Sequence, residues 1–362
     1  MNGREESTAK SIGTRVSPAA AEWRPQDEFV PRRFLSNGHA QTLVGNFSRR
    51  QCPLPQAEAH VIEVDPGRQA AGSSAAESAS HVLCHCHWQP APQTRLTLLL
   101  VHGLEGSSAS QYMLGNGARA WAAGCNVVRM NMRNCGGTEH LSPTLYHSGL
   151  SRDVHAVIRT LSAEKGLQAF ALVGYSMGGN LVLKLAGEMG EDASQCLRAV
   201  VGVSPVIDLG ISADALHLPQ NRAYEWKFMR GLMARFRRKA QLFPERYSVA
   251  GTETIRSIRE FDDRITARYS GFLGADDYYY RVASARVVGR ISVPTLILHA
   301  LDDPFIRILP ATRADLRANP HVHLLETAHG GHCAFLASRN GYDGYWAEKT
   351  LLDFVLAMGP AA

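Results

Sequence analysis

Short apolar runs alternate with amphipathic stretches along most of this 362-residue chain. Apolar runs of about four to eight residues between turn residues are typical of buried strands, whereas apolar residues three and four positions apart are typical of helices. The runs predict eight strands, at residues 61–65, 82–88, 96–101, 126–131, 170–173, 197–203, 295–300 and 322–325. The stretches between them predict helices at residues 109–123, 151–163 and 345–358, and directly after residue 176.

The alternation of strands and helices predicts an α/β fold. Parallel strands need long crossover connections, usually helices, so we expect a mostly parallel, twisted sheet of about eight strands with helices on both faces. Residues 209–285 interrupt this alternation, because they carry only helical patterns, among them single helices expected at 224–239 and 252–263. We expect this segment to form a helical lid over the mouth of the sheet, between the two parts of the core at 26–208 and 286–362.

Two segments lack a periodic pattern. Residues 1–25 are rich in Ser, Ala and charged residues, and we expect them to form a disordered tail. Residues 66–80 are rich in Gly, Ser and Ala, which predicts a flexible insert between the first two strands.

The composition is that of an ordinary globular protein, with 45% hydrophobic and 20% charged residues. The net charge of +5 is modest, and the basic run at 235–239 fits a solvated helix face better than a lipid or nucleic-acid contact. We therefore expect no nucleic-acid partner. A transient contact with a membrane surface and the oligomeric state stay open.

The cysteine content and the N-terminal residues give information on the cellular compartment of the protein. Seven cysteines at irregular spacings argue against a disulfide framework and favour a reducing, cytoplasmic compartment. Residues 1–21 lack the apolar stretch of a signal peptide. No apolar run reaches the roughly 20 residues of a membrane span, so we expect no transmembrane segment.

The strand at 82–88 contains alternating cysteines and histidines, which raises the question of a metal site. Side chains on a strand alternate between its faces, so Cys84 and Cys86 share one face and His85 and His87 share the other. Residues on opposite faces cannot close around one ion, and no second cluster stands at zinc spacing. We therefore expect a plain strand and no metal.

A candidate nucleophile lies where an apolar strand pattern passes through Gly-Tyr-Ser-Met-Gly at 174–178 into an amphipathic helix. This spacing is that of a nucleophile elbow, in which flanking glycines let strand and helix approach closely around an exposed serine, Ser176. The N-terminus of the following helix favours negative charge near this serine. The pentapeptide alone is a weak signal in a chain with 32 glycines. The strand before it and the helix after it favour the elbow over an ordinary glycine turn.

A serine nucleophile needs a base, and the base needs an orienting acid, in the chain order serine, acid, histidine. We choose His332 as the base, because the two glycines before it give its backbone freedom to turn the ring. His329 is the competing candidate.

For the acid we choose Asp303 over its neighbour Asp302, because Pro304 restricts Asp303 to an extended backbone. Asp208 is a third candidate, since it follows another predicted strand. Any one of these carboxylates could instead belong to an ordinary turn.

The reaction also needs hydrogen-bond donors for the oxyanion of a tetrahedral intermediate. We expect one donor to be the backbone N–H of Met177, directly after the nucleophile. We expect the other to be the N–H of Leu104, in the loop after the first core strand. His102 in the same loop is expected to brace it rather than to act chemically.

Seven motifs follow one another along the chain, at 102–108, 133–137, 146–149 with Asp153, 174–179, 260–263, 300–305 and 330–332. Together they resemble the α/β-hydrolase superfamily, and within it the YheT-type branch, which is similar to the animal ABHD-type lipid hydrolases. Asn134 and Ala334 stand where that branch usually has glycine.

The resemblance implies a serine hydrolase that cleaves carboxylic esters, either short acyl esters or acylglycerols, without a cofactor. It implies a catalytic triad of Ser176, Asp303 and His332, acting on a small-molecule ester or lipid. An acyltransferase or thioesterase is an alternative, because the same acyl-enzyme serves all three reactions. A binding protein with a blocked triad is a further alternative, since a fold does not fix a function.

Overall fold

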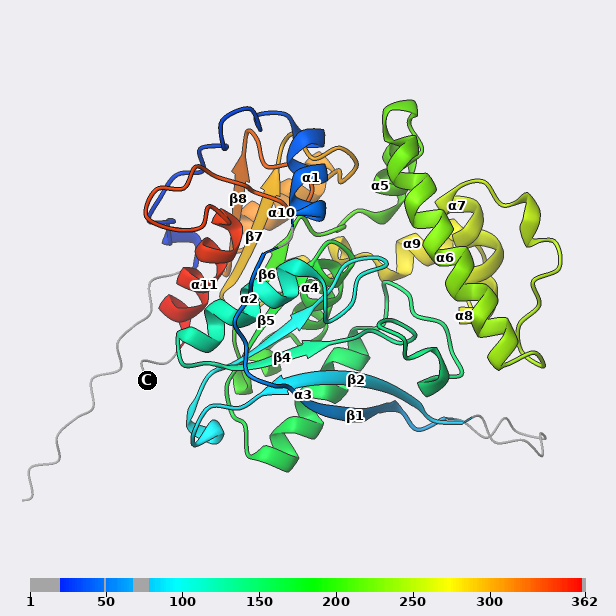
Figure 1. The fold of residues 1–362 in the computed structure, drawn as a ribbon, viewed down its shortest axis with the longest axis horizontal. Coiled ribbons are helices and arrows are strands. Elements are labelled where there is room, and N and C mark those ends of the chain that lie inside the picture. The colour runs from blue at the N-terminus through cyan, green and yellow to red at the C-terminus, as the bar shows by residue number, and fades with distance from the viewer. Residues whose placement is uncertain (1–19, 49, 68–77, 360–362) are drawn as a thin grey trace, which may run out of the picture.

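In the described part of the chain, eight strands form one sheet at the centre of the protein (Figure 1). The computed structural model describes residues 20–48, 50–67 and 78–359. The strands are β1 (Glu58–Asp65), β2 (Ser80–His87), β3 (Thr97–Val101), β4 (Asn126–Met130), β5 (Phe170–Tyr175), β6 (Leu197–Val203), β7 (Thr295–Ala300) and β8 (Val322–Thr327).

The order of the strands in the sheet is β1-β2-β4-β3-β5-β6-β7-β8. Strand β2 runs antiparallel to its neighbours β1 and β4, and all other neighbours run parallel. The predicted sheet, mostly parallel and of about eight strands, is confirmed.

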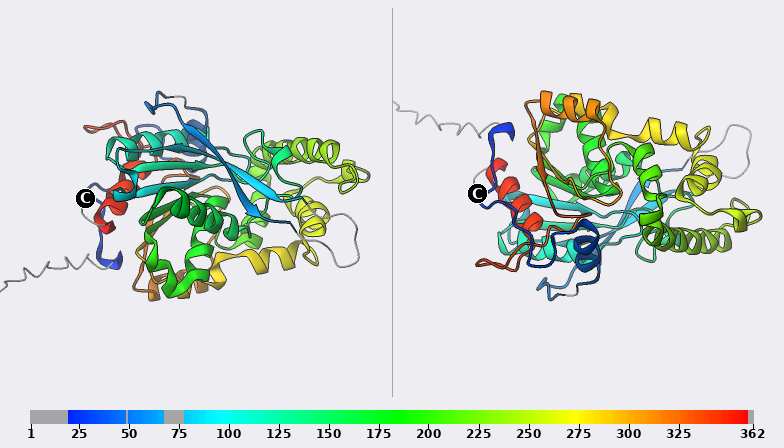
Figure 2. Two further views of the ribbon diagram at one scale, coloured as in Figure 1. Left: turned by 90° about the horizontal axis from the view of Figure 1, so that it is seen from below. Right: turned by 90° about the horizontal axis from the view of Figure 1, so that it is seen from above.

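Helices cover both faces of the sheet, as Figure 2 shows. They are α2 (Gln111–Ala122), α3 (Ser151–Lys165), α4 (Met177–Met189), α10 (Pro310–Ala318) and α11 (Trp346–Met358). Helix α1 (Gly38–Phe47) instead lies against the loops that follow β7 and β8. Helices α2 and α11 pack against each other on one face, and α3 and α4 pack against each other on the opposite face. Helix α10 packs against the edge strand β8.

The central strands are apolar on both sides, because both of their faces are covered. Successive side chains of a strand point to opposite faces. Leu99 and Leu172 therefore join the apolar cluster under α3 and α4, whereas Leu98 and Val173 join the cluster under α2 and α11. All four side chains are buried. This burial on two sides explains why continuous apolar runs marked the strands.

The segment between β6 and β7 forms a layer of helices beside the sheet, at the right of Figure 1. It contains α5 (Leu209–Leu216), α6 (Arg222–Leu242), α7 (Ile258–Phe261), a π-helical turn (Asp262–Ala267), α8 (Arg268–Ser270) and α9 (Ala275–Val282). The buried face of α6, with Met229 and Phe236, joins the apolar cluster of α3 and α4. The single helix expected at 252–263 is divided into short pieces, and its chain continues into the π-helical turn.

Residues 20–25 differ from the disordered tail expected at 1–25. Ala20–Glu22 form a short 3-10 helix, and the Trp23 ring packs edge-to-face on Phe354 with 5.2 Å between ring centroids. Burial of this large ring against α11 offsets the cost of ordering a short segment. The prediction is therefore wrong for residues 20–25. Residues 1–19, and residues 68–77 of the expected flexible insert, lie outside the described residues.

The basic run at 235–239 is not the solvated helix face that we expected. Lys239 is fully buried, and its ammonium donates hydrogen bonds to oxygen atoms of the core. Arg235 pairs with Glu105, with 3.0 Å between Nε and Oε1. Residues four apart lie on the same face of a helix, so both cations turn towards the core. The prediction is wrong for these two residues, whereas the two arginines between them are exposed.

Candidate active site

Ser176 lies in a tight turn between β5 and α4. Its φ of 53° and ψ of −114° fall in a region that residues with side chains rarely populate. Gly174 and Gly178 make the turn possible. A Cβ on Gly174 would lie 2.1 Å from the Gly178 oxygen, and a Cβ on Gly178 would lie 2.4 Å from the Val101 oxygen. The turn places Ser176 half-buried in the wall of a cavity.

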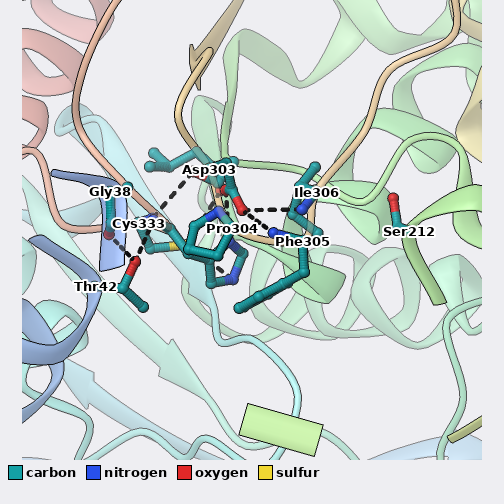
Figure 3. A network of polar contacts seen from close by, with 12 residues as sticks. Gly38, Thr42, Ser212, Asp303, Pro304, Phe305, Ile306 and Cys333 are labelled. Atoms are coloured by element: carbon teal, nitrogen blue, oxygen red, sulfur yellow. Dashed lines mark hydrogen bonds and ion pairs between the residues drawn. The ribbon is translucent and has the colours of Figure 1, made fainter. Parts of the chain in front are cut away.

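The loops after β7 and β8 bring Asp303 and His332 together. His332 Nδ1 lies 2.8 Å from Asp303 Oδ2. Asp303 Oδ1 accepts hydrogen bonds from the N–H groups of Phe305, at 3.1 Å, and Ile306, at 2.9 Å (Figure 3). Burial alone would raise the pKa of Asp303, but His332 and the Ile306 N–H hold this pKa below its usual value. A buried carboxylate therefore orients the imidazole through Nδ1.

The other acid and base candidates have different partners. Asp302 Oδ2 lies 3.4 Å from His329 Nδ1, so these two residues form a second pair beside the first. Asp208 accepts a hydrogen bond from the Thr312 hydroxyl at 3.0 Å. In the described part of the chain, neither Asp302 nor Asp208 hydrogen-bonds to His332.

Helix α1 supports the loops that carry the acid and the base, a role that sequence reasoning missed. Thr42 Oγ1 accepts a hydrogen bond from the His332 N–H at 2.8 Å and donates one to the Gly38 oxygen at 2.7 Å (Figure 3). A Cβ on Gly38 would lie 1.9 Å from the Asp302 oxygen, so only glycine fits there. The sequence signal for α1 was its N-cap residue Asn37, whose side chain accepts hydrogen bonds from two backbone N–H groups.

His332 and Ser176 line the same groove, but no hydrogen bond joins them within the described residues. His332 Nε2 instead lies 3.5 Å from Cys333 Sγ. Catalytic hydrogen bonds are often long or poorly aligned without substrate and tighten in its presence. The structure thus brings the three predicted side chains to one edge of the sheet, and the catalytic role of each stays a prediction.

Both expected oxyanion donors are unpaired among the residues that the structure describes. The N–H groups of Met177, at the start of α4, and of Leu104 donate no hydrogen bond to any described residue. His102 holds the loop of Leu104: its Nε2 accepts from the Met132 N–H at 3.1 Å, and its Nδ1 donates to the Gly103 oxygen at 2.8 Å. Burial lowers the pKa of His102 to about 4, so its ring is neutral and supports the loop.

A largely apolar cavity of about 1040 Å³ lies between Ser176 and the helices that follow β6. Polar side chains interrupt its lining, among them those of Arg235, Lys239, Asp262 and Tyr279. The apolar part of the wall includes Leu104, Leu145, Met177, Val206, Leu209, Leu216, Phe228, Leu232, Phe236, Ile258, Phe261, Phe305 and Ile306.

A second cavity, of about 1750 Å³, also reaches Ser176, and we call it the outer groove. It runs between α1, the first turns of α6 and the loop that carries His332. Leu104, Phe228 and Phe305 line both cavities together with Ser176. The Ser176 hydroxyl therefore lies where the apolar cavity meets the outer groove.

Cys84 and Cys86 of β2 are buried in the core, and His85 Nδ1 lies 2.9 Å from the Ser108 hydroxyl. Within residues 20–48, 50–67 and 78–359, no three His, Cys, Asp or Glu side chains gather as ligands of a metal ion would. The helices described in these ranges include none with the length and apolar character that crossing a bilayer requires.

Comparisons with known proteins point to one family. The sequence profile of the family described as alpha/beta hydrolase fold matches residues 97–338. The putative esterase YheT of Escherichia coli (strain K12) is 31% identical over 345 residues, which cover 93% of this chain and 95% of that protein. The phospholipase ABHD3 of Mus musculus is 29% identical over 266 residues, which cover 73% of this chain and 64% of that protein.

Among solved structures, the 2,6-dihydroxy-pseudo-oxynicotine hydrolase superposes with a TM-score of 0.54 at 15% identity, covering 88% of this chain and 72% of that one. This likeness concerns the fold alone. The sequence matches extend over nearly the whole core, and they include the segments that carry Ser176, Asp303 and His332. The chain belongs to the α/β hydrolase fold family, in the branch that includes YheT.

Proposed function

We propose that the protein is a serine hydrolase that cleaves carboxylic esters through an acyl-enzyme on Ser176. The observation that carries the proposal is the buried Asp303–His332 pair, 2.8 Å apart, at the sheet edge where Ser176 occupies a strained elbow. The unpaired N–H groups of Leu104 and Met177 would supply the donors that an oxyanion needs. Relatives named esterase and phospholipase support ester substrates.

In the proposed first step, Ser176 Oγ attacks the ester carbonyl carbon while His332 Nε2 accepts the hydroxyl proton. The N–H groups of Leu104 and Met177 bind the oxyanion of the tetrahedral intermediate. His332 then donates this proton to the alcohol oxygen as the carbon–oxygen bond breaks, and the acyl group remains on Ser176. Asp303 stabilises the imidazolium without becoming protonated.

The second step releases the acyl group. Water transfers a proton to His332 and attacks the acyl carbonyl carbon, and the same two N–H groups bind the second oxyanion. The intermediate collapses to a carboxylic acid as Ser176 recovers its proton from His332. No cofactor takes part in these steps.

The two cavities support a binding mode in which the acyl part and the alcohol part of the ester lie on different sides of Ser176. The apolar cavity suits the acyl chain, because its lining removes hydrocarbon from water. The outer groove is then the side of the alcohol group and of water. These shapes fit short acyl esters or acylglycerols.

We further propose that residues 209–285 act as the lid of this site, between core parts 26–208 and 286–362. Side chains of α5, α6 and α7 line the apolar cavity together with Ser176. A helical cover over a reacting carbonyl excludes bulk water and strengthens the hydrogen bonds to the oxyanion.

The test of the triad is chemical labelling combined with three variants. A fluorophosphonate probe is expected to label Ser176 in the folded protein, and Ser176→Ala is expected to abolish the label. Asp303→Asn is expected to lower kcat about 10⁴-fold, because the imidazole loses the partner that holds its tautomer. Asp302→Asn is the matched control: its amide oxygen can still accept the Gly331 N–H, and it is expected to lose far less activity.

A folded protein whose Ser176 resists the probe, or equal losses for Asp302→Asn and Asp303→Asn, would contradict the triad. Partition of the acyl-enzyme separates the remaining alternatives. Transfer mainly to added alcohol or thiol, rather than to water, would identify an acyltransferase. Faster hydrolysis of thioesters than of the matching oxygen esters would identify a thioesterase.

A further inference from the structure

Large apolar side chains are exposed around the outer groove. Phe47 and Leu43 of α1 are 69% and 46% exposed, and Trp226 of α6 is 64% exposed. Isolated exposed apolar residues are normal on protein surfaces. Here, however, all three line one groove, and that groove leads to Ser176.

The two helices that carry these residues are held together across the groove. His39 Nδ1 lies 3.2 Å from the Tyr224 hydroxyl, and the two rings stack. The Lys227 ammonium lies 5.1 Å from the centroid of the Phe47 ring. Figure 1 shows α1 and the start of α6 at the top of the molecule. The apolar side chains are therefore parts of one surface.

Cations accompany these apolar side chains. Arg230 lies over the Trp226 ring, with 5.4 Å between guanidinium and ring centroid, and Arg222, Lys227 and Arg230 are all exposed. The single acidic residue of α6, Glu225, is buried and accepts a hydrogen bond from the Ile258 N–H. The exposed face of α6 thus carries positive charge without an exposed carboxylate.

We propose that this surface, which we call the groove rim (Leu43, Phe47, Arg222, Trp226, Lys227 and Arg230), docks on a bilayer that contains anionic lipids. Aromatic and aliphatic side chains flanked by cations are suited to the boundary between headgroups and acyl chains. The cations attract the negative surface, and the apolar side chains insert below them. The proposal rests on the proposed function and extends it, because an ester in the bilayer would enter the outer groove directly.

The test measures binding to vesicles by flotation, with every variant in a Ser176→Ala background so that no lipid is cleaved. The protein is expected to float with vesicles of equal parts phosphatidylglycerol and phosphatidylcholine, and much less with phosphatidylcholine alone. Phe47→Ala/Trp226→Ala is expected to weaken binding about tenfold or more, because it removes the inserted apolar area. Lys227→Gln/Arg230→Gln is expected to weaken it by about tenfold on anionic vesicles only.

Matched controls come from other surfaces of the same chain. Tyr280 of α9 is 63% exposed and lies under Arg286, as Trp226 lies under Arg230, but it lines neither cavity at Ser176. Arg159 of α3 is exposed on the opposite side of the molecule from α1. Tyr280→Ala and Arg159→Gln are expected to leave flotation unchanged.

Quenching of tryptophan fluorescence by brominated lipid supplies a second measurement. Trp226 is expected to be quenched on binding, and Trp226→Phe is expected to remove most of that quenching. Absence of binding, equal losses in the control variants, or binding that ignores anionic lipid would overturn the proposal. So would a dimer that dissociates in Phe47→Ala/Trp226→Ala, since the rim would then bind a second copy of the chain. Because binding is measured without Ser176, these outcomes do not depend on whether the protein is a hydrolase.

Discussion

Cys333 occupies the position at His332 Nε2 that the Ser176 hydroxyl needs in the proposed reaction. Its sulfur lies 3.5 Å from Nε2, and its φ of 63° is unusual for a residue with a side chain. Burial works against a charged imidazole, but Cys333 and Asp303 raise the pKa of His332 above its usual value. The thiol therefore competes with the nucleophile for the base.

Replacement of Cys333 by alanine is expected to move the acidic limb of the pH profile. The base must be neutral to accept a proton, so kcat/KM rises with pH through the pKa of His332. Cys333→Ala removes a group that raises this pKa, and the limb should therefore shift to lower pH. Profiles of kcat/KM for a soluble p-nitrophenyl ester measure the shift. Cys196→Ala, at a half-exposed position outside both cavities, is the control. An unchanged limb in Cys333→Ala would show that the thiol does not act on His332.

The sequence indicated the residue types, but the choice of Asp303 over its neighbour Asp302 rested only on the backbone restriction that Pro304 imposes. Asp302 and Asp303 each pair with a histidine, and the two pairs differ mainly in burial: the Asp302 side chain is 22% exposed and that of Asp303 is 0% exposed. Burial depends on how α1 packs against these loops. The contact between Thr42 and His332 spans 290 positions in the chain, and no local pattern marks it.

Among the elements, the π-helical turn Asp262–Ala267 is the least regular part of the lid. It places Asp262 in the lining of the apolar cavity, where Tyr279 and Thr266 each donate a hydrogen bond to its carboxylate at 2.8 Å. Burial raises the pKa of Asp262 to about 6, although both hydrogen bonds act in the opposite direction. The turn therefore holds a carboxyl that resists ionisation.

This arrangement predicts a pH-dependent effect of Asp262→Asn on stability. Between about pH 4 and pH 6 the folded protein binds more protons at Asp262 than the unfolded chain does, because its pKa is about 6 when folded and near 3.8 when unfolded. The free energy of unfolding of the unsubstituted protein therefore loses a contribution as pH rises through this window. Asp262→Asn has no carboxyl to titrate and does not lose this contribution. Its free energy of unfolding, relative to that of the unsubstituted protein, should therefore rise from pH 4 to pH 7 by on the order of 2 kcal/mol.

Urea unfolding at a series of pH values measures the difference. Asp315→Asn, at an exposed position of α10, serves as the control and should show no such trend. A constant difference between Asp262→Asn and the unsubstituted protein from pH 4 to pH 7 would contradict the prediction.

The sequence predicted the strands better than the lid, for a physical reason. Strands such as β3 and β5 are buried on both faces, so nearly every residue is apolar and the run is easy to recognise. Lid helices bury one face only and also line a cavity, where polar residues such as Asp262 and Lys239 interrupt the apolar spacing. For this reason the prediction of a single helix at 252–263 was wrong. No sequence pattern indicated the cavity itself.

Across the whole molecule, one ion pair connects the lid to the loop of the proposed oxyanion donor. Arg235 of α6 pairs with Glu105, the residue after Leu104, and the side chains are 12% and 16% exposed. The Tyr146 hydroxyl donates a hydrogen bond to the same Glu105 oxygen at 2.8 Å. A Cβ on Gly231 would lie 2.2 Å from the other Glu105 oxygen, so α6 packs directly on this carboxylate. The position of the proposed lid and the shape of the loop that contains Leu104, the proposed oxyanion donor, are therefore coupled.

Arg235→Met is expected to lower the free energy of unfolding by about 3 kcal/mol, because it leaves the Glu105 carboxylate mostly buried without its cation. Glu105→Gln/Arg235→Met should lose clearly less than the sum of the two single variants, with a coupling energy of about 1–3 kcal/mol. The exposed neighbour Arg237→Met is the control and should stay within about 0.5 kcal/mol of the unsubstituted protein. Urea unfolding of the unsubstituted protein and of the four variants, the single Glu105→Gln included, measures these differences.

The kinetic constants of these variants show whether this coupling affects the candidate active site. If the lid fixes the Leu104 N–H through Glu105, Arg235→Met should lower kcat by about tenfold or more, since an oxyanion donor acts only when it is held in place before the reaction. KM for a soluble short-chain ester should change less, because the donor contributes mainly to the transition state. Additive stability losses, or a kcat equal to that of Arg237→Met, would mean that the lid and the oxyanion loop are independent. The pair would then serve only to attach α6 to the core.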